Sequence, residues 1–121
     1  MLKMTSLLLG SDNPERLVEF YTKVLDEPTM SEGGYTSWVT GAGVLTIGKH
    51  SEVHAQNKEP GRVIWFFETT DLKAEFERVK GLGGHVIAEP YDPGGPGMML
   101  ATFADPDGNY FNLSTPFEMP S

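Results

Sequence analysis

Two hydrophobic periods alternate along this chain and divide it into elements. Apolar residues three to four positions apart predict one helix that opens at Ser11-Asp12-Asn13-Pro14 and is ended by Pro28, and another after Asp71. Asp12 or Asn13 would cap the first helix, and Pro14 suits its first turn. Asp71 would cap the second, which Gly83-Gly84 ends. The apolar stripes that would face the core are Leu17, Phe20, Tyr21, Val24 and Leu25 in the first helix, and Leu72, Phe76, Val79 and Leu82 in the second.

Shorter apolar or alternating runs predict strands around these helices. The expected strands cover 2–9, 29–32, 35–40, 44–48, 62–69 and 85–89. The polar stretch 50–61 and the Gly/Pro-rich stretch 90–97 are predicted to be loops. Val63, Trp65 and Phe67 are expected to lie in the core under the helices.

The segment 100–114 predicts a β-hairpin. Period-two alternation flanks the polar break Asp105-Pro106-Asp107-Gly108-Asn109, whose Pro, Asp and Gly are turn residues. The register puts two sets of side chains on opposite faces: Phe103, Phe111 and Leu113 on one, and Thr102, Tyr110, Asn112 and Ser114 on the other.

The order strand, capped helix, strands occurs twice. Phe20 and Phe76 lie 76 − 20 = 56 residues apart in equivalent helices. Each half alone would bury its helix stripe and sheet face poorly, so the halves belong together. We therefore predict an α+β fold in a single domain over 1–121, with βαβββ modules at about 2–48 and 62–115 joined by a loop at 49–61.

Two segments carry a resemblance to a known family. The helix ERLVEFYTKVL and the turn DPDGN resemble the first helix and the final turn of the vicinal oxygen chelate superfamily. This superfamily includes glyoxalase I, extradiol dioxygenases, fosfomycin resistance enzymes and bleomycin-binding proteins. The resemblance implies two modules whose curved mixed sheets form a cup that holds a ligand. It also implies a homodimer.

Composition narrows the possible functions. The chain has 121 residues, no cysteine and a formal net charge of −8. The absence of cysteine excludes disulfides and thiolate zinc sites, and the acidity argues against nucleic acid as a partner. No apolar run reaches the roughly 18 residues of a membrane span, and the N-terminus does not resemble a signal peptide. We expect a cytoplasmic protein without a membrane partner.

The metal site of the superfamily is expected to be missing. The resemblance implies that the ligand positions are Thr5, Thr46, Ile64 and Asn112, and these side chains do not suit zinc, nickel or iron, which prefer imidazole and carboxylate. No cofactor is therefore predicted. The alternative is a divalent metal bound by a non-standard set drawn from His50, His54, Glu68 and Asn112.

Strand parity and the resemblance together predict a cup lined by apolar, aromatic and a few polar groups. Trp38 and His50 are expected near its mouth, and Glu68 is either a base beside aromatic residues or a solvated rim residue. The predicted ligand-binding residues are Thr5, Leu7, Trp38, Thr46, His50, Ile64, Phe66, Glu68, Tyr110 and Asn112.

Three functions remain open from the sequence. The first is a homodimeric, metal-free protein that binds an apolar or cationic small organic molecule, as bleomycin-binding proteins do. The alternative is a metal-dependent lyase, isomerase or dioxygenase of the glyoxalase type. The third is an interaction module whose cup is filled by its own side chains.

Overall fold

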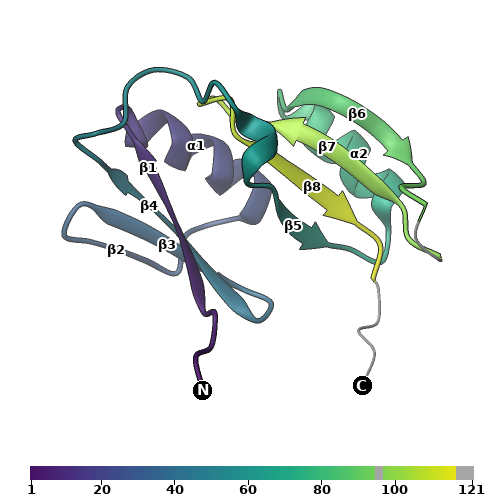
Figure 1. The fold of residues 1–121 in the computed structure, drawn as a ribbon, viewed down its shortest axis with the longest axis horizontal. Helices are drawn as coiled ribbons and strands as arrows, with labels where there is room; N and C mark the ends of the chain where they lie inside the picture. The colour runs from purple at the N-terminus through teal and green to yellow at the C-terminus, as the bar shows by residue number, and fades with distance from the viewer. Residues whose placement is uncertain (95–96, 117–121) are drawn as a thin grey trace. The chain divides into compact units, whose positions relative to one another are not determined.

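The predicted repeat is present in the computed structural model, which describes residues 1–94 and 97–116. The described residues form two α-helices and eight strands, and the chain divides into a first unit, Met1–Ala55, and a second unit, Gln56–Ser121 (Figure 1). Each unit contains one βαβββ module with a four-stranded mixed sheet. The predicted α+β fold with two modules is confirmed.

The first unit builds its sheet in the order β1-β4-β3-β2. Strands β1 and β4 are parallel, and the other neighbours are antiparallel. The parallel pair follows from the connection through the helix, which returns the chain to the same end of the sheet. The elements are β1 (Ser6–Ser11), α1 (Pro14–Leu25), β2 (Met30–Glu32), β3 (Tyr35–Thr40) and β4 (Gly43–Lys49).

Helix α1 begins where the sequence predicts. The Asn13 side chain accepts a hydrogen bond from the Arg16 backbone N–H at 3.4 Å, and Ser11 Oγ accepts one from the Asn13 N–H at 3.0 Å. These contacts satisfy N–H groups that the first turn leaves unpaired. The helix buries its predicted stripe against one face of the sheet. The core residues of this unit are Leu9, Leu17, Phe20, Tyr21, Val24, Trp38, Leu45 and Ile47.

The second unit repeats the topology with the order β5-β8-β7-β6, again with one parallel pair, β5 and β8. A single 3-10 turn, η1 (Pro60–Arg62), precedes the sheet. The elements are β5 (Trp65–Glu68), α2 (Leu72–Gly81), β6 (His85–Tyr91), β7 (Leu100–Ala104) and β8 (Tyr110–Ser114).

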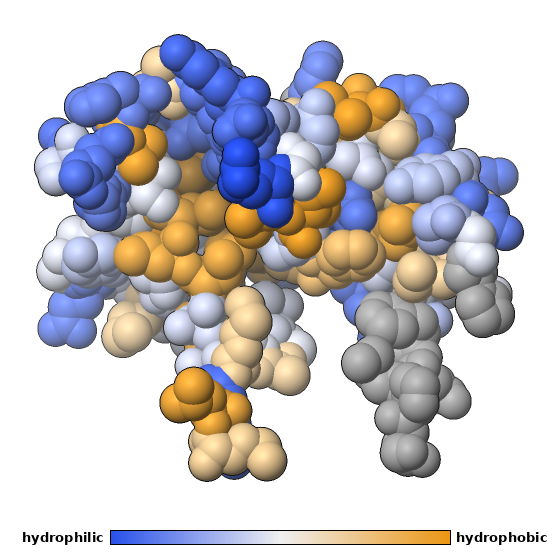
Figure 2. Space-filling model, viewed as in Figure 1, coloured by the Kyte–Doolittle hydropathy of each residue, from blue (hydrophilic) through white to orange (hydrophobic). Residues whose placement is uncertain are grey.

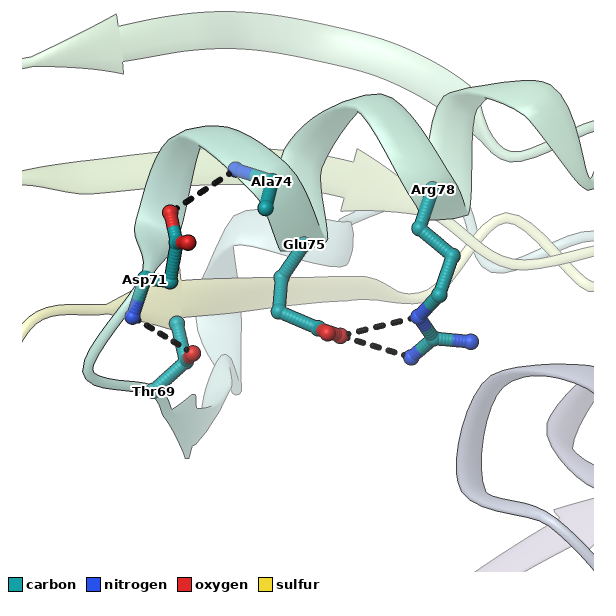
Figure 3. Close-up of polar contacts among 5 residues, drawn as sticks. All are labelled: Thr69, Asp71, Ala74, Glu75 and Arg78. Atoms are coloured by element: carbon teal, nitrogen blue, oxygen red, sulfur yellow. Dashed lines mark hydrogen bonds and ion pairs between the residues drawn. The ribbon is translucent and has the colours of Figure 1, made fainter.

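Helix α2 shows the predicted cap in detail (Figure 3). Asp71 Oδ1 accepts a hydrogen bond from the Ala74 N–H at 3.1 Å, and Thr69 Oγ1 accepts one from the Asp71 N–H at 3.0 Å. One turn on, Glu75 and Arg78 form an ion pair at 2.7 Å. Because this pair is partly exposed, it stabilises the helix by less than about 1 kcal/mol.

Aromatic rings form the core under α2. The Phe111 ring stacks on Phe103 with centroids 5.8 Å apart, and Phe103 contacts Phe76 of the helix at 5.3 Å. Trp65 and Phe67 of β5 contact Phe111 from the neighbouring strand. The hairpin faces predicted from alternation are therefore confirmed. Trp65 and Phe67 lie on the α2 face as predicted, but both are only half-buried.

The turn between β7 and β8 is held by a buried carboxylate. Asp105 Oδ1 accepts hydrogen bonds from the backbone N–H groups of Asp107 and Asn109, and its Oδ2 accepts one from Asn109 Nδ2. Gly108 adopts φ +81°, a conformation that favours glycine. Asn57 N–H donates to the Asp107 carbonyl at 2.8 Å, so the turn also anchors the start of the second unit.

Some boundaries differ from the sequence prediction. The first strand begins at Ser6 rather than at Leu2, and the strand predicted over 62–69 shortens because Pro60–Arg62 forms the 3-10 turn. Val63 is consequently exposed and not part of the core. Strand β6 continues to Tyr91 into the predicted loop 90–97, of which residues 95 and 96 lie outside the described residues, as does the predicted tail from residue 117 onward.

Neither described helix is both long enough and apolar enough to span a membrane.

Candidate functional site

Each sheet has one face that packs on the α-helix of its own unit and one that lies away from it, here called the distal face. Strand pairing assigns residues to these faces, because directly paired residues lie on the same side of a sheet. In the first unit, Trp38 and Leu45 are paired on the α1 face, while Ser37 and Thr46 are paired on the distal face. The first distal face consists of Ser6, Leu8, Gly10, Met30, Glu32, Tyr35, Ser37, Val39, Val44, Thr46 and Gly48.

The first distal face is largely apolar and exposed. Apolar side chains gather over the sheet of this unit in the space-filling view (Figure 2). Leu8 is 55% exposed and Val39 62%. Its central polar pair is internally satisfied, since Ser37 Oγ and Thr46 Oγ1 are hydrogen bonded at 2.8 Å.

Two neighbouring glycines lie at one end of this face. Gly10 and Gly48 are register partners in β1 and β4. A Cβ on Gly48 would come within 2.5 Å of the Tyr35 ring, and one on Gly10 within 2.8 Å of His50 Cβ. The Tyr35 ring and the base of His50 therefore lie directly on the backbone, where a larger residue would displace them. His50 is thus placed at the end of the first distal face, with its Nδ1 accepting a hydrogen bond from the Glu52 N–H.

The second distal face combines an exposed aromatic ring, a carboxylate and several neutral polar groups. Strand pairing aligns Phe66 with Asn112 and Glu68 with Ser114. Asn112 also pairs with Thr102 of β7, so Phe66, Asn112 and Thr102 lie side by side on three neighbouring strands. These three residues are here called the Phe66–Asn112 row. Phe66 is 47% exposed, and Glu68 is exposed as well. The residues of this face on β5, β8 and β7 are Phe66, Glu68, Leu100, Thr102, Ala104, Tyr110, Asn112 and Ser114.

Hydrogen-bonding capacity remains on the second distal face. Thr102 Oγ1 donates to Asn112 Oδ1 at 2.6 Å, which leaves Asn112 Nδ2 without a partner among the described residues. Ser114 is only 1% exposed, and its Oγ has no hydrogen-bond partner among them either. Buried polar groups are almost always paired in folded proteins, so these two groups stand out among the polar groups of this face.

The structure distributes the predicted ligand-binding residues over several environments. Thr46, Phe66, Glu68, Tyr110 and Asn112 lie on distal faces, and His50 lies at the end of the first one. Thr5 precedes β1, where its carbonyl accepts a hydrogen bond from the Val44 N–H, and the half-buried Ile64 precedes β5.

Two of the predicted positions are wrong. Trp38 is 2% exposed on the α1 face, where its ring contacts Tyr21 and its Nε1–H donates to the Asp26 carbonyl. It is a core residue and does not lie at a mouth. Leu7 is paired with the buried Leu45 and shares its face, so Leu8 takes the distal position instead.

Several residues of the distal faces were not predicted from the sequence. Ser37 and Leu8 flank Thr46 on the neighbouring strands, and only strand pairing identifies them. Thr102 and Ser114 were assigned to the correct side of the hairpin by alternation, but they were not recognised as candidate site residues. The sequence signal for Thr102 and Ser114 was a polar side chain on the hairpin face opposite Phe103 and Phe111.

The described donor groups do not fit the divalent metal of the superfamily. Thr46 and Asn112 already use an oxygen in a hydrogen bond to a neighbouring strand, and Ile64 has no donor. Within residues 1–94 and 97–116, no group of three or more His, Cys, Asp or Glu side chains is arranged to hold a metal ion. Zinc and iron sites require such imidazole, thiolate or carboxylate clusters.

Comparison with known proteins decides the family. The model of the glyoxalase-like domain matches residues 6–114, nearly the whole chain. This chain belongs to the glyoxalase-like domain family. The match extends from the first residue of β1 to the last residue of β8, so it includes both distal faces of this glyoxalase-like protein. It also supports the resemblance to the vicinal oxygen chelate superfamily.

Solved structures show the same fold. A glyoxalase/bleomycin resistance protein/dioxygenase from Nocardioides is 19% identical, with a TM-score of 0.76 over 100% of this chain and 87% of the other. A glyoxalase-related enzyme from Fulvimarina pelagi is 19% identical, with a TM-score of 0.75 over 96% and 89% of the two chains. TioX from Micromonospora sp. ML1 is 16% identical, with a TM-score of 0.70 over 93% and 98%. No curated protein matches the sequence.

Proposed function

We propose that this glyoxalase-like protein binds a small organic molecule on its second distal face without a divalent metal. The observation that carries the proposal is the Phe66–Asn112 row, where an exposed ring lies beside an amide nitrogen that has no partner among the described residues. Small-molecule sites commonly combine apolar and aromatic surface with a few polar groups that orient the ligand. One protein with the same fold is a glyoxalase/bleomycin resistance protein/dioxygenase from Nocardioides.

The ligand-binding proposal is tested by an NMR titration with small aromatic compounds. Backbone amide shifts are expected to change along 64–69 and 110–115. Phe66→Ala is expected to weaken binding by about tenfold, because it removes apolar contact area. The matched control is Phe20→Leu in the core under α1, which should leave the affinity unchanged. Shifts that are spread evenly over both units, or an unchanged affinity in Phe66→Ala, would contradict the proposal.

The metal-free part of the proposal is tested separately. We expect protein purified without chelator or nickel resin to contain no stoichiometric metal, and its melting temperature to stay constant as Ni²⁺, Zn²⁺, Mn²⁺ or anaerobic Fe²⁺ is added. A specific site would stabilise the fold by about 2.7 kcal/mol at 100-fold saturation. Stoichiometric metal with a shift for one ion would favour the alternative, a metal-dependent lyase, isomerase or dioxygenase.

The first distal face favours a second proposal, association with another copy of the chain. Leu8, Met30, Tyr35 and Val39 expose apolar surface on one side of a single sheet. Contiguous exposed apolar patches commonly mark interaction sites, and homodimers are the commonest oligomers. The edges of this four-stranded sheet are β1 and β2, and edge strands are common sites of association.

Val39→Glu is expected to shift the protein toward a monomer, because it puts a charge into the apolar patch that would be buried between copies. Sedimentation velocity over a range of concentrations measures the change. Thr40→Glu is the matched control, since this exposed neighbour follows Val39 on β3 and points to the other side of the strand. A wild-type protein that is monomeric at all concentrations would refute this proposal.

A further inference from the structure

Glu68 lies on the second distal face without a cationic partner in the part of the chain that the structure describes. It is exposed, and it forms no ion pair or hydrogen bond with any of the described residues. Other glutamates of the chain do pair: Glu19 with Lys23, Glu59 with Arg62, and Glu75 with Arg78. None of the strands β5, β6, β7 and β8 contains a lysine or arginine. The strands of the sheet that carries Glu68 therefore offer no lysine or arginine to neutralise it.

Phe66 supplies an aromatic surface at a fixed spacing from this carboxylate. The two residues are two positions apart on β5 and share its distal face. Two residues of a strand span about 6.6 Å. An aromatic ring and an amine joined by a short alkyl chain fit this spacing, with the ring on Phe66 and the amine at Glu68.

Ser114 adds a hydrogen-bonding group at the same position along the sheet. It is the register partner of Glu68 across the β5–β8 pair, and neighbouring strands lie about 4.8 Å apart. The Ser114 Oγ is buried without a hydrogen-bond partner among the described residues. A hydroxyl oxygen accepts hydrogen bonds, so one ammonium group with several N–H donors can bind both the Glu68 carboxylate and the Ser114 hydroxyl.

We infer that the second distal face binds an organic cation, an arylalkyl amine whose ammonium group is held between Glu68 and Ser114 and whose ring packs on Phe66. This inference rests on the proposed small-molecule function and specifies its ligand class. The chain's net charge of −8 adds a long-range attraction for cations.

The test compares three probes of one shape and different charge: phenethylamine, 2-phenylethanol and phenylacetate. Each is titrated into isotopically labelled protein at pH 7 and constant ionic strength. Phenethylamine is expected to bind about fivefold more tightly than 2-phenylethanol, as one partly exposed ion pair allows. Phenylacetate is expected to bind most weakly. Glu68→Gln should remove the preference for the amine over the alcohol.

Two further variants separate the local contact from general charge. Glu77→Gln removes the same charge from an exposed position on α2, the helix on the other side of the sheet, and should retain the preference. Ser114→Ala should reduce the affinity for phenethylamine by about threefold, because it removes one hydrogen bond to the ammonium group.

The outcomes distinguish this inference from the proposed function. Equal binding of amine and alcohol, or an equal loss of the preference in Glu77→Gln and Glu68→Gln, would overturn the cation inference and leave small-molecule binding standing. The absence of localised shifts with all three probes would overturn both.

Discussion

Phe111→Ala is expected to lower the free energy of unfolding by about 4 kcal/mol. The Phe111 side chain is 0% exposed, and its ring contacts the rings of Trp65, Phe67 and Phe103. Removing it leaves a cavity among rigid aromatic neighbours that are held by two strands, so the surrounding side chains close the space poorly. Urea unfolding followed by circular dichroism measures the change.

Phe66→Ala is the matched control for this experiment. Phe66 lies on β5, the strand paired with the one that carries Phe111, but on the distal face and 47% exposed. Its loss should cost less than about 1 kcal/mol, since an exposed ring loses little contact on truncation. If both variants lost similar stability, the assignment of opposite faces to these two rings would be wrong. The two variants also distinguish a residue that stabilises the fold from one that binds the ligand, because Phe66→Ala should lose ligand affinity while the fold remains intact.

Asp105→Ala is expected to cost about 3 kcal/mol. The carboxylate is 5% exposed and accepts hydrogen bonds from the Asp107 N–H at 2.9 Å and the Asn109 N–H at 3.0 Å. Truncation leaves both backbone donors without this acceptor, and each unsatisfied buried group costs about 1–3 kcal/mol. Denaturant unfolding measures the loss. Because the turn connects β7 and β8, Asp105→Ala should also weaken ligand binding on the second distal face.

Asp105→Asn tests whether the acceptor oxygen or the charge matters. The amide oxygen can retain the bonds from both backbone N–H groups, so the expected loss is only about 1 kcal/mol. An equal loss in the two variants would show that the negative charge, and not the geometry of the turn, stabilises this hairpin. A loss below about 1 kcal/mol in Asp105→Ala would contradict the role given to the carboxylate.

The two distal faces follow one plan with different chemistry. The central rows are Leu8–Thr46–Ser37 in the first unit and Phe66–Asn112–Thr102 in the second. In each row an apolar side chain lies beside a hydrogen-bonded polar pair. The apolar side chain comes from the strand that precedes the α-helix, β1 in the first unit and β5 in the second. Only the second row retains an unpaired amide nitrogen among the described residues. A row next to each central row contains a carboxylate, Glu32 in the first unit and Glu68 in the second, but Glu68 lies beside Ser114, whose buried hydroxyl has no partner among the described residues. This difference is why we propose ligand binding for the second face and self-association for the first.

The fold of each unit was predictable because its signals are local. The helix stripes, the caps at Asn13 and Asp71 and the Asp-Pro-Asp-Gly turn act within a few residues, and the repeat shows that each half uses the same order of elements. The hairpin 100–114 was predicted to the residue, with its faces, because alternation and turn chemistry agree there.

The site was less predictable, since it depends on which face of each strand the helix covers. The run Leu7-Leu8-Leu9 is apolar throughout and has no alternation, so the sequence by itself left the orientation of β1 undecided. Pairing with β4 puts Leu7 and Leu9 toward the core and Leu8 on the distal face. Trp38 is settled in the same way, by its contacts with Tyr21 and Asp26 from the helix and its end. Local patterns determine which segments become helices and strands, whereas the side of the sheet that is buried depends on contacts between residues distant in sequence, which only the tertiary structure brings together.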